Sequence, residues 1–408
     1  MITLLYGTSL TRQLVQPFAL QVNVGSEVEL VRFWSAGLFT PGGVEYQDGN
    51  EVHGIEKCLA QDFTIRPNCS RPKQSASVFS FKGRIWGLYK RILRLIKSYR
   101  NLSHVVAEID VFHVHGVSDA RFTNQLLIGR SSLPIVVSCW GSDVLRVGKI
   151  SEIKEQKKLL DRANVVTVSS PEFREIVLAK FGQCLRSKMR IAQFSPDLEG
   201  VLRGSREVEG VCFRESHRIG KDKICFGIAH NGHPGNQHLS ILSGLDDLDQ
   251  KLKERLFLVI PMTYGAQPEY VRKIRNKLEQ LGIDFVVLTD FMTPTEVVGL
   301  RLALDVFVFA PQTDSFSATV SQALAAGVEC ILGSWLPYKL RTSAGFLYSQ
   351  IDSPSEVGKA LTYVVENYLG DADRQQTNKE LSETFFEPAA LGKAWKNVYR
   401  EALDSASF

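Results

Sequence analysis

The chain has 408 residues, of which 44% are hydrophobic and 23% are charged, so it is long enough to bury two separate cores. Its formal net charge of +4 is too small to indicate a nucleic-acid-binding protein covered with basic residues. Its 7 cysteines show no Cys-x-x-Cys spacing, which is typical of reduced thiols and not of a zinc site. We therefore expect two domains and neither a metal nor a nucleic-acid partner.

The start of the chain indicates a cytoplasmic protein. Residues 2–6 (ITLLY) have neither a basic leader nor a small-residue cleavage site. No apolar run in the sequence is long enough to span a bilayer. We expect the protein in the cytoplasm.

Short apolar runs rich in β-branched residues alternate with helical patterns along most of the chain. This alternation is typical of parallel sheets covered by helices on both faces. The strands predicted in the first half are 2–6, 28–33, 111–115, 135–139 and 165–169. Those predicted in the second half are 224–228, 256–260, 285–289, 306–310 and 329–332. The predicted fold class is α/β, with two Rossmann-like doubly wound domains facing each other across a cleft.

The two groups of strands set the predicted domain boundaries. Residues 1–200 form the first domain and 223–370 the second, joined by a Gly-, Ser- and charge-rich linker at 196–222. Residues 371–408 contain a predicted helix at 377–402, which we expect to cross back to the first domain. Ligands of open α/β sheets bind at the carboxyl ends of the strands, so the chemistry is expected in the cleft.

The most specific motif is 310–327 (APQTDSFSATVSQALAAG), which follows a predicted strand. It leads into a helix whose first turn is predicted at 315–318 and whose end is marked by Gly327. In the turn that begins at Ser315, the backbone N–H groups of Phe316 and Ser317 would bind a diphosphate, aided by the helix dipole. The alternative interpretation is an ordinary crossover helix with an aspartate near its N-cap.

This segment resembles the signature of glycosyltransferase family 4, in which two glutamates flank seven residues ahead of an Ala-rich helix. Asp314 and Gln322 stand at the two positions with the same interval, Asp for Glu and Gln for Glu. The resemblance implies a GT-B fold and a retaining transfer of sugar from a UDP-, GDP- or dTDP-linked donor, without a metal. It places Asp314 near the donor sugar, the intervening amides on the distal phosphate and Gln322 on the ribose. Because Gln322 is uncharged, it would bind the ribose more weakly than a glutamate.

Two further motifs follow strands of the first domain. Residues 110–116 (DVFHVHG) resemble the family's strand-terminal histidine that reaches the donor sugar, a role that falls to His115, with His113 expected on the other face. Residues 138–145 (SCWGSDVL) resemble a Gly-Ser-Asp turn near the acceptor, which makes Asp143 a candidate base if the reaction inverts. A structural histidine and a capped helix start explain the same residues equally well.

The second domain offers two more candidate ligand contacts. The loop 229–238 (AHNGHPGNQH) carries His230 and Asn231 where family 4 supplies Arg and Lys, and we expect these two residues to stabilise the departing diphosphate. The loop is also similar to the phosphate loop of transferases that use acetamido-dideoxygalactose donors, which would imply inversion. Phe291 and Met292 resemble the segment whose backbone reads the nucleotide base, although a plain helix start explains it too.

Residues 79–100 combine apolar and basic side chains without a single acid. Such a helix suits the anionic inner leaflet of the cytoplasmic membrane, which favours peripheral attachment and a lipid-linked glycan acceptor. A crossover helix with a buried apolar face is the alternative.

Together these motifs predict a glycosyltransferase of bacterial surface polysaccharide or lipopolysaccharide biosynthesis. Two rival hypotheses remain. One is a sugar-nucleotide epimerase on the same fold, and the other is a non-catalytic partner subunit that the changes at Asp314 and Gln322 have inactivated.

Overall fold

The computed structural model describes residues 2–8, 28–35, 110–118, 120–129, 132–194 and 198–405. The basic segment 79–100 lies outside these residues. The chain divides into two compact units. Unit 1 comprises Met1–Ser169, Arg174–Gln193 and Pro388–Phe408, and unit 2 comprises Ser170–Phe173 and Phe194–Glu387.

Unit 1 contains a six-stranded parallel sheet in the order β2-β1-β3-β4-β5-β6. The strands are β1 (Ile2–Thr8), β2 (Val28–Ser35), β3 (Val111–His115), β4 (Ile135–Ser138), β5 (Val165–Val168) and β6 (Met189–Ile191). The first five lie within a few residues of the predicted strands. Strand β6 was not predicted, because three residues are too few to show a periodic pattern.

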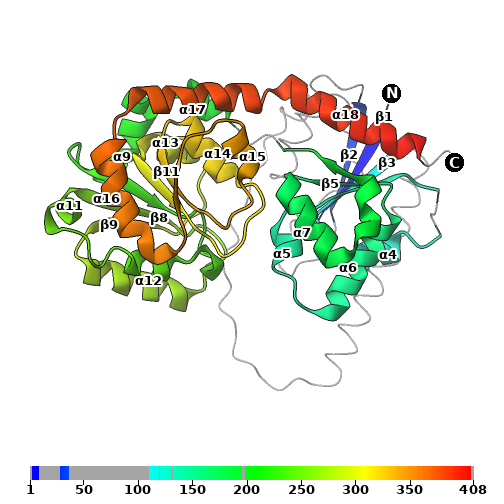
Figure 1. The fold of residues 1–408 in the computed structure, drawn as a ribbon, viewed down its shortest axis with the longest axis horizontal. Coiled ribbons are helices and arrows are strands. Elements are labelled where there is room, and N and C mark those ends of the chain that lie inside the picture. Colours follow the sequence, from blue (N-terminus) through cyan, green and yellow to red (C-terminus); the bar gives the residue numbers. More distant parts are fainter. Residues whose placement is uncertain are drawn as a thin grey trace, which may run out of the picture. The chain divides into compact units, whose positions relative to one another are not determined.

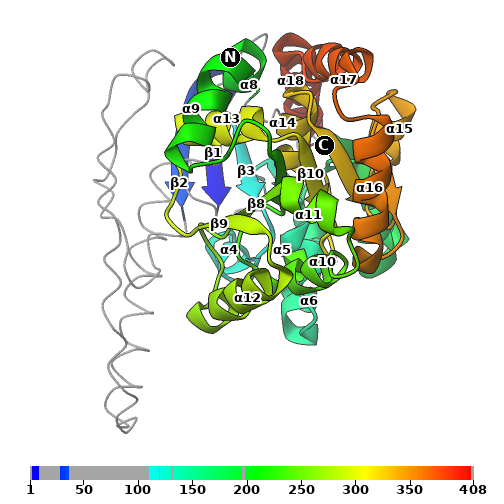
Figure 2. The same ribbon diagram turned by 90° about the vertical axis from the view of Figure 1, so that its left-hand side faces the viewer.

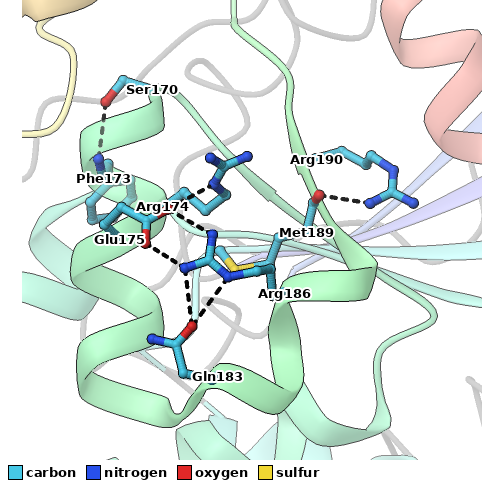
Figure 3. A network of polar contacts seen from close by, with 8 residues as sticks. All are labelled: Ser170, Phe173, Arg174, Glu175, Gln183, Arg186, Met189 and Arg190. Carbon is cyan, nitrogen blue, oxygen red and sulfur yellow. Dashed lines mark hydrogen bonds and ion pairs between the residues drawn. The ribbon is translucent and has the colours of Figure 1, made fainter.

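The helices that accompany this sheet are short or moderately long. They are α4 (Ala120–Leu126), α5 (Ser142–Leu145), α6 (Ile150–Arg162), α7 (Pro171–Phe181) and the 3-10 helix η2 (Gln183–Lys188). Figure 3 shows that Oγ of Ser170 accepts the N–H of Phe173 at 3.1 Å and so caps the first turn of α7. The guanidinium of Arg186 donates to both carboxylate oxygens of Glu175, at 3.0 and 2.6 Å (Figure 3). Both side chains are 49% exposed, so this pair stabilises the fold little.

Helix α18 (Pro388–Asp404) completes the core of unit 1 although it is distant in sequence. It packs against β3, β4 and β5, and Figure 1 shows it, in red, alongside the strands of this unit. Trp395 is fully buried and its Nε1 donates to the carbonyl oxygen of Gln193 at 3.0 Å. The helix predicted at 377–402 is therefore two helices, α17 (Ala372–Phe385) and α18, separated just before Pro388.

Unit 2 contains a second six-stranded parallel sheet, in the order β12-β11-β10-β7-β8-β9. The strands are β7 (Ile224–Ile228), β8 (Leu256–Pro261), β9 (Asp284–Leu288), β10 (Val306–Phe309), β11 (Glu329–Gly333) and β12 (Ser349–Ile351). Only the short edge strand β12 was not predicted. The order reverses between β7 and β10, which places a topological switch point at their carboxyl ends.

Helices cover both faces of this sheet. The large apolar core includes side chains from α10 (His238–Ser243), α11 (Gln250–Arg255), α12 (Pro268–Leu281) and α16 (Val357–Asn367). Helices α13 (Pro294–Ala303) and α14 (Ala318–Ala325) lie on the side of the sheet away from α12 (Figure 1). Figure 2 shows α10 and α12 beside each other, in agreement with their packing contact.

The segment expected to be a linker, 196–222, folds over most of its described length. It forms α8 (Glu199–Arg203), the π-helix η3 (Arg206–Gly210) and α9 (Val211–Ser216), all packed against α13. Three of its four glycines, Gly200, Gly204 and Gly210, are contact points with α13. A Cβ on Gly210 would lie 2.8 Å from the carbonyl oxygen of Leu302, so a larger residue there would push α13 away. No described helix combines the length and the apolar character that crossing a bilayer requires.

We predict that Trp395→Ala lowers the free energy of unfolding by about 3–5 kcal/mol, because it opens a cavity in the core of unit 1 and leaves the Gln193 carbonyl without its donor. Urea unfolding followed by circular dichroism measures the change. Ile150→Ala is the control, since Ile150 is 72% exposed and its loss should change stability by less than about 0.5 kcal/mol. Equal effects of the two variants would contradict the role given to α18.

Candidate functional site

In unit 2 the loops after β7, β8 and β10 meet at the carboxyl edge of the sheet. The N–H of Gly232 donates to the carbonyl oxygen of Tyr264, and the N–H of Gln312 donates to that of Gly235, both at 2.8 Å. A Cβ on Gly232 would lie 2.2 Å from the Cβ of Ala266, so only glycine permits the first of these contacts. The backbone thus joins three loops at the switch point of the sheet.

The loop after β7 is held by its own asparagines. Asn231 is buried, and its Oδ1 accepts from the N–H of His233 at 2.9 Å and from Nδ2 of Asn236 at 2.7 Å. Its Nδ2 lies 2.6 Å from Nε2 of His230, which places the proton of a neutral His230 on Nδ1. Burial lowers the pKa of His238, at the end of this loop, to about 4. His230 and Asn231 therefore lie together, with the Asn231 carboxamide directed into the loop.

The backbone at both ends of this loop is strained. Ala229 and Gln237 have φ values of 59° and 60°, a left-handed conformation that residues with a Cβ rarely adopt. Each such residue costs about 1 kcal/mol or more, and strain of this kind is concentrated at ligand-binding sites.

Helix α14 begins at Ala318, so the first turn predicted at 315–318 is wrong. Ser317 is the N-cap, with φ −57° and ψ 124°. The reason is a local hydrogen-bonding alternative to the helix. The carboxylate of Asp314 faces the backbone N–H groups of Ser315 and Ser317, and the Tyr338 hydroxyl donates to its Oδ2 at 2.6 Å. Of the two amides predicted to bind the diphosphate, those of Phe316 and Ser317, that of Ser317 thus already lies beside an internal carboxylate.

A buried arginine holds the other side of the same segment. Arg341, in the short helix α15 (Lys339–Ser343), is fully buried, and its Nη2 donates to Ser317 O and to Ser321 Oγ, both at 2.9 Å. Its guanidinium carbon lies 3.8 Å from the ring centroid of Phe316, a cation–π contact. Burial raises the pKa of Asp314, while Tyr338 and Arg341 oppose that rise.

Sequence reasoning missed Tyr338 and Arg341, which reach the segment from the connection after β11. Their three-residue spacing could have shown that they share one helical face. It could not have shown which segment they contact.

The remaining residues predicted to bind the donor are spread along this edge. Gln322 lies on α14, and its Oε1 is 3.4 Å from Nε of the buried Arg301 on α13. Phe291 and Met292 follow β9, Phe291 being 68% exposed. The capping box between Thr293 and Glu296 accounts for the start of α13 without a ligand. No His, Cys, Asp or Glu cluster suited to a metal ion occurs in the part of the chain that the structure describes.

In unit 1 the two histidines of β3 are both buried and lie together. Their ring centroids are 3.9 Å apart, because residues two apart in a strand share a face, so the expectation for His113 was wrong. His113 lies 2.9 Å from the Tyr399 hydroxyl and 2.7 Å from Ser138 Oγ, which continues to Thr167 Oγ1 at 2.6 Å. Burial lowers the pKa of His115 to about 3, so His115 is neutral at physiological pH.

Asp143 binds the backbone around it. Its Oδ2 accepts the N–H of Val117 and its Oδ1 accepts that of Trp140, both at 2.9 Å. Burial raises the pKa of this carboxyl, and these backbone hydrogen bonds oppose the rise. Asp143 thereby ties the turn after β3 to the turn after β4.

The chain is similar over nearly its whole length to several solved structures. A glycosyltransferase from Rickettsia africae matches with a TM-score of 0.69 at 11% identity, covering 98% of each chain. Anabaena HepE in complex with UDP and glucose matches at 0.67 with 12% identity, over 96% of this chain and 98% of that one. A sucrose-phosphate synthase from Thermosynechococcus elongatus matches at 0.66 with 12% identity, over 98% of each chain.

These similarities confirm the predicted fold class, which is the GT-B arrangement of two Rossmann-like domains. No protein-family model matches the chain, and a search of curated proteins finds no similar sequence.

We predict that stability falls as the pH is lowered from about 6.5 to 5. The folded-state pKa values of His113, His115 and His238 are all depressed, so below about pH 6.5 the unfolded chain takes up protons that the folded chain does not. His115→Asn should reduce this slope by up to about 1.4 kcal/mol per pH unit, as urea unfolding at each pH would measure.

Between pH 7.5 and 8.5 these histidines are neutral in both states, so the two proteins should show parallel pH dependence there. An unchanged slope between pH 6.5 and 5 in His115→Asn would contradict the neutral, buried state of His115. The raised pKa of Asp143 acts in the opposite sense, and it does so in both proteins.

Proposed function

We propose that this chain is a glycosyltransferase that moves a sugar from a nucleotide diphosphate donor to an acceptor, with the diphosphate at the amino end of α14. The observation that carries the proposal is the position of α14. It follows β10 at the switch point of a GT-B sheet, with Asp314 and Gln322 on either side of its start. The first N–H groups of a helix have no partner within the helix and are suited to a phosphate.

The contacts of Asp314 support this location. Its carboxylate already faces the N–H groups of Ser315 and Ser317, so these groups can hold an anion. A donor phosphate would share or replace that contact, and the next amide along, that of Ala318, would be added. HepE has been solved with UDP and with UDP-glucose, and we therefore expect UDP before GDP or dTDP.

For the chemical step we assign His115 to the donor sugar and Asp143 to positioning. A neutral imidazole can exchange hydrogen bonds with sugar hydroxyls without placing a charge beside them. Both oxygens of Asp143 accept backbone N–H groups, which favours a retaining reaction over one that needs Asp143 as a base. His230 and Asn231 would stabilise the leaving diphosphate in place of a metal ion.

The acceptor side of the proposal rests on the sequence. The acid-free segment 79–100 favours an acceptor at the cytoplasmic membrane, such as a lipid-linked glycan in surface-polysaccharide assembly.

We predict that UDP, GDP or dTDP raises the melting temperature, whereas NAD and ATP do not, because a ligand that binds only the folded state stabilises it. Ala318→Pro should weaken binding of the preferred nucleoside diphosphate by roughly 10- to 100-fold, since it removes one N–H donor to a charged group. Proline fits the first helical position, and the extended Ser317 suits the residue before it.

Ala372→Pro is the matched control, because it makes the same change at the first position of α17. Its nucleotide affinity should equal that of the wild type. The proposed diphosphate position would be refuted if both proline variants bound the nucleotide as tightly as the wild type.

We further predict that His115→Ala abolishes sugar transfer and leaves the affinity for the nucleoside diphosphate within about 3-fold of the wild type, because the residue acts on the sugar. Turnover with the preferred donor and calorimetric titration of its diphosphate measure the two quantities. Loss of both together would contradict this placement. Donor binding by the wild type without any transfer would instead favour a non-catalytic subunit, and epimerisation of the donor without acceptor would favour an epimerase.

A further inference from the structure

Arg301 is an arginine in the interior of unit 2. It lies on α13 between Leu300 and Leu302, and only 4% of its surface is exposed. Its guanidinium carbon lies 5.7 Å from the ring centroid of Phe307, on the adjacent strand β10. Burial lowers its pKa to about 10, so the side chain stays charged at neutral pH.

The polar contacts of Arg301 do not compensate this charge. Its Nε lies 3.4 Å from Oε1 of Gln322, and its Nη1 has no hydrogen-bond partner among the described residues. The neighbouring groups that act on its pKa are Cys330 and Tyr264, and no described carboxylate is among them. Arg301 is therefore a buried cation whose described neighbours supply no counter-ion.

A second buried arginine of the same unit shows the contrast. Arg341 is also fully buried, but Asp314 and Tyr338 act on it electrostatically, and its Nη2 makes two hydrogen bonds at 2.9 Å. A buried charge without a partner costs several kcal/mol, which an apolar side chain of similar volume would avoid. An anion from outside the chain would offset that cost at Arg301.

The position of Arg301 indicates which anion this would be. It is next to Gln322, which stands about one turn along α14, the helix whose amino end is the proposed diphosphate position. The loop after β7, residues 229–238, contains no lysine or arginine to offset a diphosphate. Gln322 can accept the N–H of Arg301 without cancelling its charge, whereas a glutamate there would cancel it.

We propose that Arg301 is the positioning residue that makes this subsite selective for an anionic nucleotide. It orients the Gln322 carboxamide through its oxygen and supplies the positive field that favours a nucleoside diphosphate over the uncharged nucleoside. This role rests on the proposed function. It explains why an uncharged residue at position 322 is compatible with donor binding.

The test compares UDP with uridine by isothermal titration calorimetry, using the full-length protein. Arg301→Met, which keeps most of the volume and removes the charge, should weaken UDP binding at least 10-fold and uridine binding less than 3-fold. A merely structural role would weaken both equally. Arg214→Met is the control, because Arg214 is a partly buried arginine of unit 2 that pairs with Asp305, and its variant should bind both ligands like the wild type.

A double-mutant cycle on the melting temperature of the ligand-free protein distinguishes loss of the Arg301 charge from loss of folding. In the wild-type background, Gln322→Glu places a carboxylate beside Arg301, so the melting temperature should hold or rise while UDP affinity falls more than uridine affinity. In the Arg301→Met background the same carboxylate has no cation, and the melting temperature should fall.

Equal losses for UDP and uridine in Arg301→Met would overturn the proposal, as would equal effects of Gln322→Glu in the two backgrounds. Failure of the wild type to bind UDP, GDP or dTDP would refute the proposed function itself. Wild-type UDP binding that Arg301→Met leaves unchanged would refute the role of Arg301 alone.

Discussion

A parallel strand covered by helices on both faces has no side open to water, and this constraint decides where polar chemistry can lie in this chain. In β3, β4, β5, β7, β8, β10 and β11 every residue is buried. A polar side chain must therefore either lie beyond the end of a strand or, if it is buried within the sheet, have hydrogen-bond partners inside the fold. His113 is buried within the sheet and has Ser138 and Tyr399 as its hydrogen-bond partners. The asparagines of the loop after β7 lie beyond the end of a strand.

The same constraint applies to the two buried arginines of unit 2, which differ in the partners that the fold gives them. Around Arg341 the chain supplies the Asp314 carboxylate, the Ser321 hydroxyl and the Ser317 carbonyl, and these contacts tie Arg341 to the start of α14. Around Arg301 the described residues supply a single long hydrogen bond, to Gln322. One cation thus stabilises the shape of the site, and the other makes its charge suitable for an anion.

Much of the architecture could be read from the sequence, because a buried parallel strand is a continuous apolar run. Strands β3 and β7 occur at the predicted residues, whereas the three-residue strands β6 and β12 carry too little pattern to be recognised. The sequence predicted a linker at 196–222 because glycine, which allows close helix packing in this segment, is also typical of loops.

The candidate site was predictable only in outline. The motif around Asp314 and Gln322 could be located, since it is continuous in sequence. The start of α14 could not, because it depends on Tyr338 and Arg341, which approach from another connection. Arg301 lies in an apolar helical segment, and the sequence does not show that its charge is buried without a neighbouring carboxylate.

The amino-terminal unit of this protein is not contiguous in sequence, since Trp395 and Tyr399 of α18 fill its interior. During synthesis its sheet would be complete long before the helix that covers it emerges from the ribosome, and the long segment Phe194–Glu387 of unit 2 is translated in between. Nascent unit 1 must therefore keep an apolar face uncovered throughout that interval. A chaperone that binds exposed hydrophobic surface would bind this face during synthesis. Because unit 1 is built from separate parts of the chain, no single cut would release it intact.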